Sequence, residues 1–210
     1  DIVHLPDGDM TLHVEMRCSV PIERVDVFNG LDLVETIRPY RQDELGSRIR
    51  VVWQGAEYRG RFRQVIWDGS AFLSDNEIIS ATPINFFNKD KTLEKPASNE
   101  LHWKALTTGN IGGFDIILAD AYNGTLKIET PLIKAGVPIE DIGFEDEVFD
   151  NSGVLPRYLK IFRLPTENPH KTMRFSRLID LKAVGDNPIF IRLTQEDGTL
   201  VWTSPIYVYR

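Results

Sequence analysis

The chain has 210 residues, of which 42% are hydrophobic, 26% charged and 10% aromatic, and its formal net charge is −7. This length is enough to bury a large core without a metal or a disulfide. The acidic balance disfavours binding to duplex nucleic acid, which needs a clustered positive surface, and the one cysteine excludes both an intrachain disulfide and a zinc site built on several thiolates.

The sequence also bears on targeting. It has no run of about 18 apolar residues, so no membrane-spanning helix is predicted. The chain starts at Asp1 without an initiator Met and without a signal peptide, and we interpret it as a processed product or a piece of a longer protein. The absence of disulfides favours a reducing compartment such as the cytoplasm.

Alternation of apolar and polar residues, which is typical of half-buried strands, runs through the whole chain. In chain order, strands are predicted at residues 10–18, 22–28, 31–37, 48–53, 61–67, 77–87, 101–106, 114–121, 125–130, 157–164, 173–184, 188–194 and 200–209. Turn pairs are predicted at Asn29-Gly30, Asp68-Gly69, Asn123-Gly124 and Asp197-Gly198. The polar segment 88–99 is predicted to be a loop, and residues 134–153 to be acidic and turn-rich with a short helix near 138–142. These elements predict an all-β fold, a β-sandwich or two sandwiched sheets.

Groups for catalysis are sparse in this sequence. His4, His13, His102 and His170 lie far apart, without the short spacing of a metal site. Cys18 continues an apolar strand pattern and is predicted to be a core residue. The glycine cluster 107–113 is predicted to be a wide turn, and the acidic run 141–150 a solvated surface, with a calcium-binding loop as the alternative. No catalytic residue, metal site or cofactor is therefore predicted.

The richest local pattern is the segment 48–68, in which arginines alternate with aromatic residues. Guanidinium groups bind phosphates and carboxylates through paired hydrogen bonds, and aromatic rings stack on sugars or bases. The same residue types are enriched at protein interfaces. The segment is either a domain interface, a ligand groove, or an exposed sheet face whose aromatic residues lie in the core. The candidate residues are Trp53, Tyr58, Arg59, Arg61, Arg63 and Trp67.

Two stretches resemble a known family. Residues 21–30, PIERVDVFNG, are similar to the Arg-Val-x-Val-x-Asn-Gly strand and turn found after PHP-type metal-dependent hydrolase domains. Residues 190–198, FIRLTQEDG, and residues 201–208, VWTSPIYV, are similar to the closing hairpin of the same appended domain, aromatic-x-Arg-x-Thr-Gln-x-Asp-Gly and then Ala-Trp-Ser-Ser-Pro-Ile. The resemblance is to the C-terminal region of large PHP-like proteins of unknown function, predicted relatives of phosphoesterases.

This resemblance implies an Ig-like β-sandwich that packs on the N-terminal catalytic barrel of the same polypeptide. The metal ligands of the family belong to that barrel, and none of their motifs occurs here, so no catalytic residue is transferred. The matching stretches lie near opposite ends of the chain, whereas in shorter relatives they lie closer together. We therefore predict a discontinuous sandwich of residues 1–88 plus 172–210, with residues 89–171 as an inserted β-rich subdomain.

The leading hypothesis is a non-catalytic accessory domain that covers the barrel and shapes substrate access or homo-oligomer contacts. The alternative is a carbohydrate- or polyanion-binding β-sandwich that uses Trp53, Tyr58 and the nearby arginines. A third hypothesis is a free-standing hydrolase whose metal ligands come from distant segments.

Overall fold

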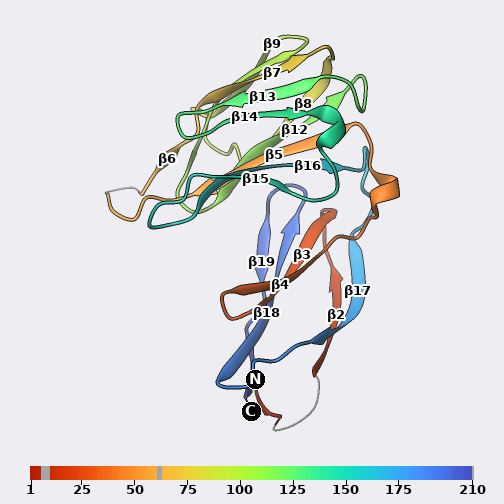
Figure 1. Cartoon of the computed structure of the whole chain (residues 1–210), viewed down its shortest axis with the longest axis vertical. Helices are drawn as coiled ribbons and strands as arrows, with labels where there is room; N and C mark the ends of the chain where they lie inside the picture. Colours follow the sequence, from red (N-terminus) through yellow and green to blue (C-terminus); the bar gives the residue numbers. More distant parts are fainter. Residues whose placement is uncertain (6–9, 61–62, 210) are drawn as a thin grey trace. The chain divides into compact units, whose positions relative to one another are not determined.

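The computed structural model describes residues 1–5, 10–60 and 63–209, and its regular structure is almost entirely β-strand. The predicted all-β fold is confirmed. The chain divides into two compact units, the terminal unit (Asp1–Tyr40 with Asn168–Arg210) and the inserted unit (Arg41–Glu167). Both are visible in Figure 1, where the terminal unit is drawn in red and in blue, the colours of the first and last residues of the chain.

The terminal unit is built from two sheets. Its strands are β1 (Ile2–His4), β2 (Met10–Arg17), β3 (Ile22–Asn29), β4 (Asp32–Ile37), β17 (Thr172–Ile179), β18 (Asp186–Gln195), β19 (Leu200–Trp202) and β20 (Ile206–Tyr209). The larger sheet has the order β1-β20-β18-β3-β4, with β19 also paired to β18, and the smaller sheet pairs β2 with β17 (Figure 1). Strand β1 is parallel to β20, and β18 is antiparallel to both β20 and β3.

The two sheets of the terminal unit share one hydrophobic core. Leu12 and Phe175 from the smaller sheet join Val25, Val27 and Leu193 from the larger one in a single buried cluster. Since strand side chains alternate between faces, the strand residues in between these positions project from the outer faces. The turn predicted at Asn29-Gly30 is confirmed, and Gly30 has the positive φ of 63° that favours glycine there.

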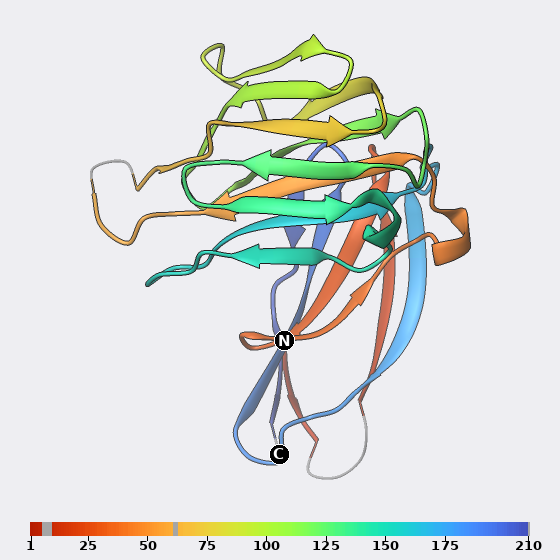
Figure 2. The same ribbon diagram turned by 45° about the horizontal axis from the view of Figure 1, so that its top comes forward.

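The inserted unit is a second β-sandwich. Its strands are β5 (Arg48–Gly55), β6 (Val65–Ile66), β7 (Gly69–Ser74), β8 (Ile78–Ile84), β9 (Thr92–Ala97), β10 (Glu100–Lys104), β11 (Leu106–Thr107), β12 (Ile111–Leu118), β13 (Thr125–Glu129), β14 (Lys134–Pro138), β15 (Glu147–Asp150) and β16 (Arg157–Leu164). One sheet has the order β14-β13-β7-β10-β9, the other the order β15-β16-β5-β12-β8, and β6 pairs with β11. In Figure 2 β13 and β14 are two neighbouring green arrows.

Tryptophans fill the core of the inserted unit. The Trp53 ring stacks on Trp103, with 5.5 Å between the ring centroids and 12° between the planes, and meets the edge of Phe114 at 5.9 Å. Leu73 and Leu126 from the facing sheet belong to the same buried cluster. Large aromatic rings bury much apolar area per residue, so this cluster dominates the stability of the unit.

Helical structure is limited to two single turns of 3₁₀ helix within the described residues. They are η1 (Gln42–Glu44) and η2 (Ile139–Asp141), and the second lies within the short helix predicted at 138–142. In the part of the chain that the structure describes, no helix is long and apolar enough to cross a membrane.

The two units have limits that differ from the predicted ranges of 1–88 plus 172–210 and 89–171. Residues 41–88 fold with the following segment, because β5 pairs with β12 and β16, and β7 pairs with β10 and β13. The segment 88–99 does not separate two bodies. Part of it, Thr92–Ala97, forms β9 at the sheet edge, where Pro96 is tolerated because an edge strand leaves some backbone groups unpaired.

Candidate functional site

The segment of alternating arginines and aromatic residues does not form one surface. Trp53 and Trp67 are 0% exposed and belong to the core. The Trp67 Nε1 donates a 2.8 Å hydrogen bond to Thr107 Oγ1, which itself donates to the Gly55 carbonyl at 2.7 Å. Both indoles are therefore structural groups that a surface ligand cannot reach, and the predicted groove does not include them.

The other candidates of that segment lie between β5 and β6. Tyr58, Arg59 and Arg63 are exposed there, and the Arg59 guanidinium lies 5.5 Å from the centroid of the Tyr58 ring. Arg61 lies outside the described residues. Arg63 has a φ of 51°, in the left-handed region, and among the described residues of the predicted strand 61–67 only Val65–Ile66 form a strand, β6. The alternation thus combines core positions on β5 with an exposed loop.

The neighbouring arginines of β5 face a carboxylate instead. Arg50 donates from Nε to Asp115 Oδ1 at 2.7 Å, and Arg48 donates from Nε to Asp115 Oδ2 at 3.0 Å. Burial alone would raise the pKa of Asp115, but the two guanidinium groups outweigh it and hold that pKa below its ordinary value. This cluster joins β5 to β12. Both guanidinium groups are directed at the Asp115 carboxylate of the neighbouring strand.

The titratable groups singled out in the sequence remain scattered. His13 is hydrogen-bonded to Ser176 at 2.8 Å and His102 to Glu100 at 2.7 Å, in different units. Burial raises the pKa of the Cys18 thiol, which packs against the core of the terminal unit. Among residues 1–5, 10–60 and 63–209, no three His, Cys, Asp or Glu side chains gather closely enough to hold a metal ion.

An exposed apolar surface lies on the outer side of the larger sheet of the terminal unit. We name it the aromatic face and define it by Phe28, Leu33, Phe190, Trp202 and Tyr207. The register places Phe28 opposite both Phe190 and Leu33, and the two phenyl rings stack with centroids 5.0 Å apart. Leu33, Trp202 and Tyr207 are 54%, 56% and 43% exposed.

A cation lies among these rings. The guanidinium carbon of Arg192 is 5.2 Å from the Phe28 centroid, and its Nη2 donates to Asp26 Oδ2 at 2.7 Å. Trp202 lies opposite Arg192 on β19. A contiguous patch of aromatic residues with an arginine is the composition typical of protein interfaces rather than of free surfaces.

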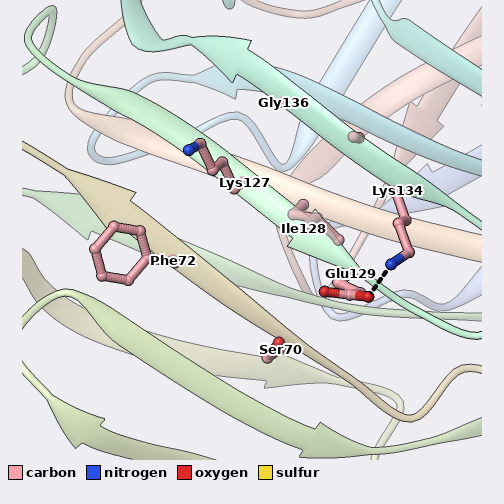
Figure 3. A pocket seen from close by; sticks show the side chains of 8 residues that line it. Ser70, Phe72, Lys127, Ile128, Glu129, Lys134 and Gly136 are labelled. Carbon is pink, nitrogen blue, oxygen red and sulfur yellow. Dashed lines mark ion pairs between the residues drawn. The ribbon is translucent and has the colours of Figure 1, made fainter.

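A second surface feature is a depression on the outer side of the β14-β13-β7-β10-β9 sheet of the inserted unit (Figure 3). Phe72 and Ser70 of β7, Lys127 and Glu129 of β13, and Lys134 of β14 line it. These residues are not among those that the sequence pattern marks as candidates. One signal was present, since Phe72 is an apolar residue out of phase with its buried neighbours Ala71 and Leu73.

Comparison with known proteins gives no relative. No family model matches the chain, and neither the curated proteins nor the solved structures contain a match. The class of the protein is therefore inferred from its own fold, which is all-β with β-sandwich packing.

Proposed function

We propose that the chain is a non-catalytic C-terminal accessory region of a PHP-type metal-dependent hydrolase. In this proposal the terminal unit, with an Ig-like arrangement, packs on the catalytic barrel of the same polypeptide, and the inserted unit is an elaboration of it. The observation that carries the proposal is the pairing of β3 with β18, since β3 lies in the first stretch that resembles the family and β18 contains the start of the second.

The residues of those stretches hold the terminal unit together. Asn29 donates from Nδ2 to Asn187 Oδ1 at 2.8 Å, and Asp26 pairs with Arg192. The Gln195 backbone N–H donates to Thr199 at 2.9 Å in the turn before β19. An appended structural domain needs residues that stabilise its own small sandwich, and the residues of these stretches do so. Their contacts therefore support a resemblance of fold.

The aromatic face supplies the surface for docking. Covering apolar side chains that are exposed to water is favourable, by roughly 25 cal/mol per Å² of apolar area buried. Phe28 and Phe190 project from the same strands that carry the resemblance. We therefore assign the contact with the barrel to this face rather than to the segment 48–68.

The test compares the 210-residue chain with the protein that contains the preceding barrel. We expect amide exchange in β18, β19 and β20 to slow when the barrel is present, and we expect Trp202→Ser to weaken that protection. Val184→Ser is the matched control, because Val184 is 88% exposed in the segment before β18. Equal exchange with and without a barrel, or an upstream coding sequence without a barrel, would contradict the proposal.

Activity provides a second test. The isolated chain should not turn over phosphoesters in the presence of Mn²⁺, Zn²⁺ or Fe²⁺. Turnover by the purified chain that persists after removal of trace contaminants would refute the accessory role and favour the free-standing hydrolase.

A further inference from the structure

We propose that the depression on the outer side of the β14-β13-β7-β10-β9 sheet binds an acidic saccharide, with one sugar ring on Phe72 and its carboxylate at Lys127. This inference is independent of the accessory role, since it concerns a different unit and a different surface.

The shape of the site follows from the strand register. Phe72, Lys127 and Gly136 form one row across β7, β13 and β14, and Ser70, Glu129 and Lys134 form the next. Each row ends in a small side chain, Gly136 or Ser70. The resulting depression has a volume of about 530 Å³, within the range of roughly 300–1,000 Å³ that is usual for small-ligand pockets.

The glycine keeps one wall of the depression low. A Cβ atom placed at Gly136 would meet nothing nearer than Lys127 Cγ at 3.9 Å, so the space above the β14 backbone is open. Figure 3 shows Phe72 and Lys127 on adjacent strands, with Glu129 and Lys134 joined by an ion pair in the neighbouring row. All these side chains stand on strands of a paired ladder, which fixes their spacing before a ligand arrives.

Phe72 provides an apolar platform. Its side chain is 45% exposed in the middle of a sheet face, and polar side chains surround it, Lys127 on one neighbouring strand and Glu100 on the other. Isolated phenyl rings in polar surroundings suit ligands that have an apolar face and a polar rim. A pyranose ring has this character, because its C–H groups pack on the aromatic face while its hydroxyl groups point outward.

The charges select the acidic form of such a ligand. Glu129 is paired with Lys134 and Glu100 with His102, whereas Lys127 makes no hydrogen bond or ion pair with another residue in the described part of the chain. The ammonium group of Lys127 can therefore receive a carboxylate. The two glutamates accept hydrogen bonds from hydroxyl groups and repel densely charged anions, so a saccharide with a single carboxylate on each ring fits better than a polyphosphate or a nucleic acid.

The experiment is a titration of the whole chain with trigalacturonate, the neutral galactose trimer, benzoate and inorganic phosphate, followed by calorimetry and by NMR shifts. We expect saturable binding of trigalacturonate, with affinity for the neutral trimer lower by about tenfold, the equivalent of one modest charge interaction. Raised salt should weaken the acidic ligand more than the neutral one.

Two substitutions locate the site. Phe72→Ala and Lys127→Gln should each lower the affinity for trigalacturonate by about tenfold or more, and Lys127→Gln should abolish the preference for the acidic trimer. Phe87→Ala and Lys104→Gln are the controls, because Phe87 is 87% exposed in a loop and Lys104 is exposed elsewhere on the same sheet face. Neither control should change the binding.

Several results would overturn the inference. These are the absence of binding by either trimer, equal affinity for the acidic and neutral trimers, benzoate or phosphate bound as tightly as trigalacturonate, and binding that both Phe72→Ala and Lys127→Gln leave intact. Because both substituted side chains point outward, unchanged circular dichroism and melting of the variants will separate lost binding from lost folding.

Discussion

Asp26 and Arg192 lie opposite each other on β3 and β18, and an ion pair of 2.7 Å joins them across 166 positions of sequence. Thr36 Oγ1 also donates to Asp26 Oδ1 at 2.7 Å, so one carboxylate connects three neighbouring strands. The side chain of Asp26 is 2% exposed and that of Arg192 27% exposed. The stability of the terminal unit depends on this carboxylate because its removal leaves a partly buried arginine without its partner.

The first prediction concerns this pair. Asp26→Asn should lower the free energy of unfolding of the terminal unit by about 2 kcal/mol. Hydrogen exchange of the amides in β3 and β18 measures the effect in that unit alone. Asp32→Asn is the control, since the Lys182–Asp32 pair is 50% and 69% exposed and should contribute less than about 1 kcal/mol. Equal effects of both changes would argue against the assigned role.

The second prediction concerns acid stability of the inserted unit. The arginines hold the pKa of Asp115 below its ordinary value despite its burial, so the stabilisation is fully present above the unfolded pKa of about 3.9 and is lost as the pH falls through the lower, folded pKa. Asp115→Asn should destabilise the unit by about 3 kcal/mol at pH 7 and reduce its loss of stability in acid. Urea unfolding, monitored by tryptophan fluorescence at a series of pH values, measures both. An unchanged acid dependence would contradict this assignment.

The third prediction concerns the close approach of β5 and β12. A Cβ atom at Gly113 would lie 2.2 Å from the Val51 carbonyl oxygen and 2.9 Å from Val52 Cα. Backbone atoms cannot yield easily, so Gly113→Ala should cost about 2 kcal/mol or more. Gly143→Ala, at a position with open space, should change the melting temperature little. A melting temperature of Gly113→Ala close to the unsubstituted value would show that the strands can separate.

The fourth prediction concerns the hydrogen bonds of Thr107. Thr107→Val keeps the shape of the side chain but leaves the buried Trp67 Nε1 without its partner, at a cost of about 2 kcal/mol, while the Gly55 carbonyl keeps the hydrogen bond from the Gly109 N–H. Thr108→Val, at an exposed neighbour, should have little effect. Chemical denaturation of both variants compares them directly, and similar midpoints would exclude a structural role for this hydroxyl group.

The sequence predicted the strands with clear alternation. Residues 10–18 contain β2, and residues 173–184 contain all of β17 except Thr172. Trp53 and Trp67 lie in the core, as one of the three interpretations of the segment 48–68 expected of its aromatic residues. Strands β9, β14 and β15 were missed. Their pairing depends on backbone hydrogen bonds, which carry no side-chain signal, and only one of their residues, Val137, is buried.

Sequence patterns could not locate the surfaces that the structure presents. Alternation shows which residues of a strand share a face, but not whether that face is covered. The pattern therefore could not distinguish Phe28 and Phe190 from core residues. The depression near Phe72 depends on the register of three strands. One of them, β7, is not predicted as a strand, because Asp68-Gly69 at its start indicates a turn. Pairing across strands is a long-range property that short sequence windows do not contain.

The division of the terminal unit has a consequence for its synthesis. Strands β3 and β2 find their partners β18 and β17 only in residues that follow the inserted unit. During synthesis on the ribosome, the inserted unit can complete its own sheets first. The apolar faces of β2 and β3 stay uncovered until β17 and β18 have been synthesised. A chain truncated before residue 172 would leave β2 without its partner β17, and β3 would be paired with β4 alone.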